Sequence, residues 1–440
     1  METGNLNFYV SEGNPGRLLS DCNAFTADSI NSYFSVESGK WYFFTPLHDV
    51  DMMKITHSAN ASFVFRYYDG ESRATNGTGN SWRNVDTGKL LAGQGYIFHC
   101  NAAGIVSMPA EATGHLQVLN TSDVTKSLSA YEATASANKS WNYVGNPYPS
   151  YYDVYYMDFT APITVWTGST YKAYSIVDDN LVLRPMQAFF VQKPDEVDNI
   201  IFHKEGRQLS SSIERASYAK PREGATSSAK RDFFNLQITS DDEVVDETRI
   251  VVNEKASLAY EIETDASKFM SMESNVPQLF TLDSENNRYA INERPLSDGS
   301  VRIGYRASVA GFYTISAIRA DGNATLYDSK LNKTVDLTLQ DYTFYSDATD
   351  EADNSRFILM LGVADPYTGI DNAETSRLSV NGSNGNIVVA GATGKHIIVY
   401  TIDGRQVYNG IANSANMNIA VPSGAYIIKV NNSTYKTSVF

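Results

Sequence analysis

The feature that most constrains the fold is an internal repeat of aromatic segments within the first 207 residues. The stretch WYFFTP at 41–46 resembles WNYVGNP at 141–147, and each is typical of a short aromatic strand closed by proline. Three further pairs follow in the same order: FVFRYYDG (63–70) with ITVWTG (163–168), GQGYIFH (93–99) with MQAFFVQ (186–192), and GIVSMP (104–109) with NIIFHKEG (199–206). The shared order predicts two copies of one supersecondary unit, at about 36–115 and 136–207.

The stretch GNPYPS at 145–150 is predicted to end a buried strand abruptly. Gly145 is expected to permit a positive φ. Pro147 and Pro149 cannot donate to a β-ladder, so they hold the chain extended as it leaves the sheet. The tyrosines that follow either pack on the end of the sheet or stack on sugar rings, and packing is the interpretation that we favour.

The rest of the chain divides at two segments that lack strand patterning. Residues 208–231 are rich in Ser, Ala and charge, and residues 364–376 carry Pro, Gly and polar residues, as linkers do. They separate regions 1–207, 232–363 and 377–440. Short strands between turn residues predict a β-sandwich in the second region. A hairpin around Asp403 and Gly404 predicts a small β-sandwich at the C-terminus.

The predicted fold class is therefore all-β, with tandem β-sandwich modules of the immunoglobulin-like or jelly-roll-like kind. A high aromatic content of 12% agrees with a strand-rich chain. The formal net charge of −15 argues against nucleic acid as a partner, because phosphate backbones select basic surfaces. The acidic run at 241–247 is expected to form a solvated hairpin turn. No apolar window is long enough for a transmembrane segment. No signal peptide precedes the strand-like start, so the sequence is expected to be either a mature form or a fragment whose upstream part is missing.

No catalytic constellation is found. The six histidines are scattered, and neither a metal-binding motif nor a phosphate-binding loop is present. Cys22 and Cys100 fit no zinc motif, and they are either free thiols, which we favour, or a single disulfide. The sequence predicts no enzyme activity, no cofactor and no metal site.

The C-terminal stretch resembles the C-terminal sorting domain of Bacteroidetes proteins exported by type IX secretion. The residues that carry the resemblance are Tyr400, Asp403, Gly404, Arg405, Val407, Gly424, Tyr426, Ile427, Val430 and Lys436. The GNPYP motif and the Gln187–Val191 segment resemble modules that stand beside such domains in large surface proteins. The resemblance implies an extracellular or outer-membrane-attached protein whose partners are the type IX translocon and the anchoring machinery.

These features predict a secreted or surface-anchored bacterial protein whose β-sandwich modules serve adhesion, glycan binding or spacing. The ligand of such a protein is a glycan or a host surface, and glycan binding predicts a flat patch of exposed rings. The candidates for that patch are Trp82, Trp166, Tyr151 and Tyr152. The alternative is that the chain is the C-terminal part of a secreted carbohydrate-active or other hydrolytic enzyme with an upstream catalytic region. A third hypothesis is a structural subunit of a pilus or stalk.

Overall fold

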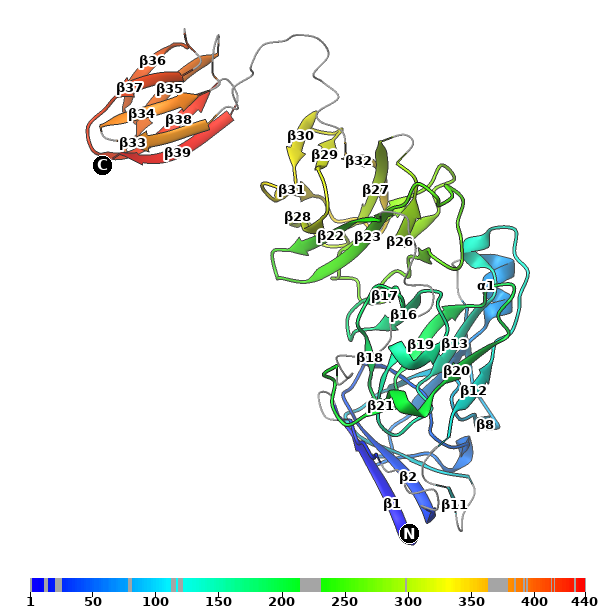
Figure 1. Ribbon diagram of the computed structural model, residues 1–440. Coiled ribbons are helices and arrows are strands. Elements are labelled where there is room, and N and C mark those ends of the chain that lie inside the picture. Colours follow the sequence, from blue (N-terminus) through cyan, green and yellow to red (C-terminus); the bar gives the residue numbers. More distant parts are fainter. Residues whose placement is uncertain are drawn as a thin grey trace. The chain divides into compact units, whose positions relative to one another are not determined.

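The computed structural model shows an almost purely β protein, with 53% of residues in strands and 5% in helices, which confirms the predicted fold class (Figure 1). Two compact units are present, at residues 1–364 and 365–440. The structure describes residues 2–11, 15–19, 26–77, 81–111, 116–117, 122–213, 231–296, 299–362, 379–383, 385–390, 392, 395–412, 414, 416–430 and 433–439. The predicted linker at 364–376, Cys22 and most of the segment 208–231 lie outside these residues.

The first unit begins with two sets of strands that correspond one to one. The first set is β2 (Thr26–Val36), β3 (Trp41–Phe44), β4 (Val50–Asp51), β5 (Thr56–His57), β6 (Phe63–Tyr68), β7 (Trp82–Asn84), β8 (Lys89–Leu90), β9 (Tyr96–Cys100) and β10 (Gly104–Pro109). The second set is β12 (Val124–Ser127), β13 (Trp141–Gly145), β14 (Tyr151–Asp153), β15 (Met157–Asp158), β16 (Ile163–Trp166), β17 (Tyr171–Tyr174), β18 (Val182–Leu183), β19 (Ala188–Gln192) and β20 (Asn199–Phe202).

Strand order in the two sets is the same. The main sheet is β3-β9-β6-β7 in the first and β13-β19-β16-β17 in the second. The smaller sheets also correspond: β2-β10-β5 with β12-β20-β15, and β4-β8 with β14-β18. We call the two sets the first and second copies. Short 3-10 helices, η1 (Met52–Lys54) and η3 (Val154–Tyr156), occupy equivalent places, and the side chains of Asp51 and Asp153 cap them in the same way.

The copies differ mainly in what is added to them. The first copy carries β1 (Glu2–Val10), which pairs in parallel with β2, and β11 (Leu116–Gln117), which pairs antiparallel with it. It also carries α1 (Gly70–Asn76), where Asp69 caps the helix by accepting the amide of Ser72. The remaining short elements are η2 (Ser136–Asn138), η4 (Lys204–Gly206) and β21 (Arg207–Gln208).

The GNPYPS stretch is packed inside the second copy. The buried Asn146 side chain donates to the carbonyls of Ser150 (2.8 Å) and Arg184 (3.0 Å) and accepts the amide of Tyr148 (3.0 Å). Tyr148 and Tyr152 are fully buried, and their rings stack 5.5 Å apart. The side-chain amide of Asn146 therefore fixes the path of the chain as it leaves β13, and Tyr148 and Tyr152 fill the core.

The third module of this unit is one sheet of eleven strands that folds over its own core. Its strands are β22 (Asp232–Ser240), β23 (Val245–Val252), β24 (Ala266–Ser267), β25 (Gln278–Leu282), β26 (Arg288–Arg294), β27 (Ser300–Arg306), β28 (Gly311–Ala320), β29 (Ala324–Asp328), β30 (Lys333–Asp336), β31 (Tyr342–Ser346) and β32 (Asp353–Leu361). Their order is β30-β29-β32-β27-β25-β26-β23-β22-β28-β31, with β24 beside β26. Asp328 of β29 joins the two ends of the sheet, because it accepts the hydroxyl of Tyr342 in β31 at 2.6 Å. It also accepts Arg356 of the neighbouring strand β32 at 2.8 Å.

Buried contacts join the third module to the second copy. The Phe269 ring lies 4.6 Å from Phe190 of β19. Asp246 accepts the Thr170 hydroxyl at 3.0 Å. The sequence predicts Asp246 in a solvated turn, and that prediction is wrong: Asp246 lies within β23, where it is buried and paired with Lys268. Of the acidic residues in the run, only Asp241, Asp242 and Glu243 are exposed.

The second unit is a small sandwich of two sheets. Its strands are β33 (Ser379–Ser383), β34 (Asn386–Ala390), β35 (His396–Thr401), β36 (Gln406–Ile411), β37 (Asn416–Ala420), β38 (Gly424–Val430) and β39 (Ser433–Val439). They form the sheets β33-β34-β37 and β36-β35-β38-β39 around Ile387, Val399 and Ile428. Gly404 has a φ of +86°, and its amide closes the predicted hairpin by donating to the Thr401 carbonyl at 2.9 Å.

Candidate functional site

The two copies of the repeat pack against each other through the aromatic faces of their main sheets. The rings of Phe43 and Trp166 stack 4.8 Å apart. Trp82 meets Tyr143 edge-on at 5.5 Å, and Tyr68 meets Phe190 edge-on at 4.8 Å. We call this contact between the copies the seam. Rings at these separations add attraction beyond the area that they bury.

Two equivalent backbone hydrogen bonds cross the seam in opposite directions. The Thr45 amide donates to the Met186 carbonyl at 2.9 Å, and the Gly145 amide donates to the Gly93 carbonyl at 3.1 Å. The expectation of a positive φ at Gly145 is wrong, because the residue belongs to strand β13 and is not among the positive-φ glycines. Glycine is required there for another reason: a Cβ would lie 2.1 Å from Cγ2 of Thr45.

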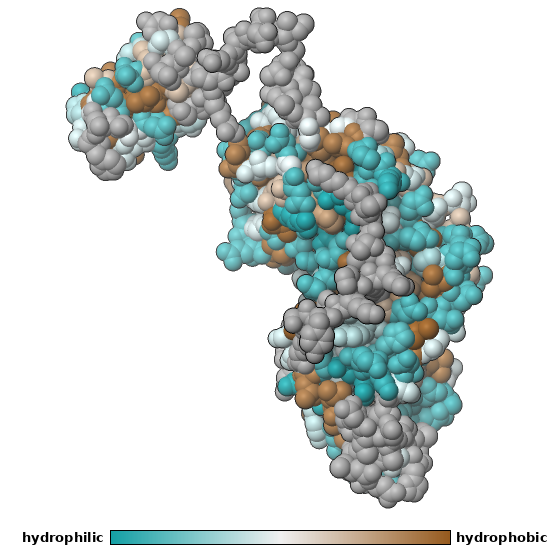
Figure 2. All heavy atoms as spheres, in the orientation of Figure 1, coloured by the Kyte–Doolittle hydropathy of each residue, from teal (hydrophilic) through white to brown (hydrophobic). Residues whose placement is uncertain are grey.

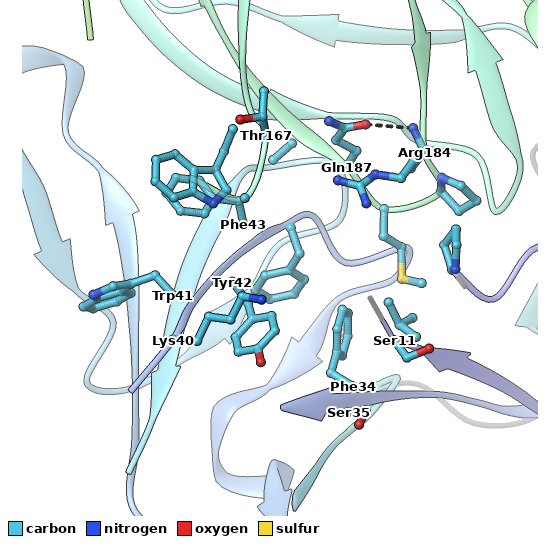
Figure 3. A pocket seen from close by; sticks show the side chains of 18 residues that line it. Ser11, Phe34, Ser35, Lys40, Trp41, Tyr42, Phe43, Thr167, Arg184 and Gln187 are labelled. Atoms are coloured by element: carbon cyan, nitrogen blue, oxygen red, sulfur yellow. Dashed lines mark hydrogen bonds between the residues drawn. The ribbon is translucent and has the colours of Figure 1, made fainter. Parts of the chain in front are cut away.

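A pocket opens at one end of the seam, and we call it the seam pocket (Figure 3). Its volume is about 150 Å³. The first copy contributes the strand run Lys40–Phe44, and the second contributes two turns, at 166–168 and 184–188. The other lining residues are Val10, Ser11, Pro15, Phe34 and Ser35. The site therefore exists only because the two copies are packed together.

The chemistry of the seam pocket combines aromatic walls with a cationic rim. Trp41, Tyr42 and Phe43 are half-buried, whereas Arg184 is exposed. The Gln187 side chain accepts the Arg184 amide at 2.8 Å, which holds the turn in place (Figure 3). Burial raises the pKa of Tyr42, whose hydroxyl oxygen accepts the Glu37 amide. Such a surface can hold a small ligand that has an apolar face and polar groups.

The four residues predicted to form a glycan-binding patch do not form one. Tyr152 is 0% exposed, and Tyr151 and Trp166 are each 8% exposed. Trp82 is half-buried, with its ring in the seam. Of the four, only Trp166 lines the seam pocket. The prediction of an exposed flat patch is therefore wrong for these residues, because their rings are buried in the cores of the copies or in the seam.

The sequence did not identify Trp41, Lys40 or Arg184 as site residues. Trp41 was available as the first residue of the repeat, and it keeps partial exposure with the guanidinium of Arg66 4.9 Å from its ring. Lys40 and Arg184 come from turns 144 positions apart, and only the seam brings them to one pocket. No local sequence pattern predicts that these two residues line the same pocket.

The sorting-motif residues divide into core and surface. Tyr426 and Val430 are buried, and Tyr400, Val407 and Ile427 are half-buried. The exposed members are Asp403, Gly404, Arg405, Gly424 and Lys436. A hydrogen bond with Thr401 holds the pKa of the Asp403 carboxyl below its usual value. The exposed hairpin turn at 403–405 is thus the longest continuous part of the motif that solvent reaches.

Two further groups have chemical potential. Asp123, His203 and Glu205 place their ligand atoms within 4.8 Å of one another on the surface of the second copy. The His203 ring already bonds the Asp123 carboxylate at 2.9 Å, which accounts for the cluster without an ion. Cys100 is a buried free thiol, and burial raises its pKa to about 11. A buried protonated thiol is inert.

Comparisons with known proteins give two family matches. A family model described as "Domain of unknown function (DUF8693)" matches residues 150–361, and one described as "Domain of unknown function (DUF6383)" matches residues 367–439. No curated protein matches the chain. None of the helices in the described part of the chain is long and apolar enough to cross a membrane.

Two solved structures show only distant likeness. "The Bacillus anthracis TIE protein" is 9% identical with a TM-score of 0.11, and the match covers 94% of this chain and 72% of that one. "Biofilm associated protein - BSP domain" is 9% identical with a TM-score of 0.12, with 97% and 98% covered. These scores are too low to indicate a shared fold. The family matches are more informative about architecture, because the first runs from the second copy through the third module, and the second spans the C-terminal unit.

Proposed function

We propose that residues 1–362 form a non-catalytic ligand-binding module of a secreted or surface-attached bacterial protein. The observation that carries the proposal is the seam pocket, because two copies of a repeat create there a site that neither copy has alone. Figure 2 shows hydrophilic residues over most of the visible face of this unit, with apolar residues scattered among them. In this role the packed modules hold the pocket in a fixed frame, and the ligand is a small extracellular molecule such as a sugar.

The proposed role of the C-terminal unit is export and anchoring. Its support is the resemblance to type IX sorting domains, together with its separation as a compact unit. The exposed residues Arg405 and Lys436 are the first positions to test. In a bacterium with type IX secretion, Arg405→Ala and Lys436→Ala should reduce the protein at the cell surface. Lys330→Ala, an exposed lysine of the third module, is the matched control. Equal surface amounts for the variants and the control would contradict this role.

Added bulk at the edge of the seam pocket tests the ligand-binding role without removing core side chains. Ser35 is an exposed residue of the lining, so Ser35→Trp should place an indole beside the cavity, where it hinders a ligand, and leave the rings of the seam in place. Thr334→Trp, at an exposed position of β30, is the control for an added indole. The purified full chain and both variants are compared on a glycan array, and hits are measured by calorimetry. Binding that Ser35→Trp abolishes and Thr334→Trp preserves supports the proposal. Absence of any hit, or binding unaffected by Ser35→Trp, contradicts it.

A further inference from the structure

The charged residues that line the seam pocket are opposite in sign to the net charge of the whole chain, and Glu37 lies behind them against Tyr42. The protein has 50 acidic and 35 basic residues, for a formal net charge of −15. The described lining of the seam pocket nevertheless contains two cations, Lys40 and Arg184, and no Asp or Glu. A local excess of positive charge on an acidic protein attracts anions to that place.

The two cations come from different copies and border the same cavity (Figure 3). Lys40 immediately precedes β3, and Arg184 lies in the turn before β19. The backbone of Arg184 is fixed at both ends, because its amide donates to Gln187 at 2.8 Å and its carbonyl accepts the buried Asn146 side chain at 3.0 Å. The backbone that carries the Arg184 guanidinium is therefore held in a defined turn, and Arg184 is exposed at the edge of the seam pocket.

The repeat shows that this cavity is not an automatic result of the packing. On the opposite side of the seam, Gly93 takes the place of Met186, and the side chain of Lys126 fills the space beside it. The Lys126 ammonium donates to the Ala92 carbonyl at 2.5 Å. The Lys126 side chain therefore fills the space on this side of the seam. On the other side the lining leaves a cavity, which Lys40 and Arg184 border.

We propose that the seam pocket binds a carboxylate on a compact ring, and that an acidic sugar is its ligand class. This inference rests on the proposed ligand-binding function and names its substrate class. Arg184 suits a carboxylate because a guanidinium presents paired donors to the two oxygens. Lys40 supplies a second positive charge, and the aromatic walls face the apolar side of the ring. The volume of about 150 Å³ suits one ring rather than a polymer chain.

Calorimetry on the full chain tests the inference with matched probes. Glucuronate and galacturonate are compared with glucose and galactose, which lack the carboxylate. N-acetylphenylalanine supplies a carboxylate from a peptide source. We expect the uronates to bind at least about tenfold more tightly than the neutral sugars and more tightly than N-acetylphenylalanine, and to weaken as salt is raised. Arg184→Gln and Lys40→Gln should each lower uronate affinity about tenfold. Lys330→Gln, an equal change of charge far from the pocket in sequence, should not.

The outcomes separate this inference from the proposed function. If neutral sugars bind as tightly as uronates and Ser35→Trp abolishes both, the pocket is a ligand site and the acidic class is wrong. If N-acetylphenylalanine binds most tightly, the carboxylate is recognised but the sugar is wrong. If both Arg184→Gln and Lys40→Gln keep their melting temperature and still bind uronates as the wild type does, the carboxylate does not bind at these two residues and the inference is overturned. No binding by any probe or array glycan overturns both proposals.

Discussion

Met186 occupies in the second copy the place that Gly93 occupies in the first, and both residues have a positive φ, of +57° and +71°. Each precedes a glutamine at the start of an equivalent strand, and each carbonyl accepts the hydrogen bond that crosses the seam. The left-handed turn is therefore needed for the contact between the copies. A methionine can stand there because its side chain is buried in the core of the first copy, which offsets the backbone strain.

Gly93→Ala should destabilise the first unit more than the same substitution at a glycine that has a positive φ but no close neighbours. A Cβ at Gly93 would lie 2.0 Å from Cε of Lys126, so the Lys126 side chain must move. The control is Gly39→Ala, because Gly39 also has a positive φ, of +81°, but has open space around its Cβ position. We expect about 1–2 kcal/mol for Gly39→Ala and a larger loss for Gly93→Ala, measured by urea unfolding. Equal losses would show that Lys126 adapts without cost.

The repeat and the strand content were predictable because they depend on local patterns. Aromatic and β-branched runs closed by proline or glycine indicate strands wherever they occur, and Trp41 and Trp141 begin equivalent strands of the two copies. The hairpin at Gly404 was predictable for the same reason, since a short turn of this kind requires a residue with positive φ.

The seam was not predictable because a single strand does not show what will cover it. Trp166 and Tyr152 read equally well as exposed sugar-stacking rings or as core, and the packing partners Phe43 and Tyr148 decide for core. Asp246 was misread for a related reason. Acidic runs are usually solvated, and its partner Lys268 lies far along the chain, across a buried contact.

Lys268→Met should be strongly destabilising. The Lys268 ammonium lies 2.5 Å from the Asp246 carboxylate, and both side chains are 1% exposed. Removal of one partner leaves a buried carboxylate whose other acceptor bonds, from Thr170 and the Leu279 amide, do not neutralise it. We expect a loss of about 3–5 kcal/mol in the free energy of unfolding. Lys89→Met, which breaks the exposed pair with Glu111, should cost far less, because solvent screens that pair. Similar losses for both variants would contradict the importance of burial.

Cys100 should resist thiol reagents until the first unit unfolds. The side chain is 0% exposed, and burial raises its pKa to about 11, so little thiolate forms near pH 8. A Cys22→Ser background leaves Cys100 as the single thiol. Reaction with a chromogenic disulfide should be slow in buffer and fast in denaturant. Rapid reaction under native conditions would show that strand β9 opens readily.

Asp265 should make the first unit less stable as pH rises from about 5 to 8. Burial raises the pKa of this carboxyl to about 8, although it accepts the backbone amides of Glu261 (2.9 Å) and Glu293 (2.7 Å). In the unfolded chain an aspartate titrates near a pKa of about 3.9. Between these values the folded state binds more protons than the unfolded state. Stability is therefore fully present below about pH 4 and is lost as pH rises, by at most about 1.4 kcal/mol per unit.

Asp265→Asn separates this effect from the hydrogen bonds of the site. The asparagine carries no charge at any pH, so the free energy of unfolding of the variant should lack the contribution from Asp265 to the pH slope. Its single side-chain oxygen cannot serve both amides equally, so the variant is expected to be less stable at pH 5. The measurement is the difference between the wild type and the variant in urea unfolding at pH 5, 6, 7 and 8, with the exposed Asp347→Asn as control. The gap should narrow with rising pH for Asp265→Asn and stay constant for the control. A constant gap for both would mean that Asp265 is ionised throughout and that its two amide donors outweigh its burial.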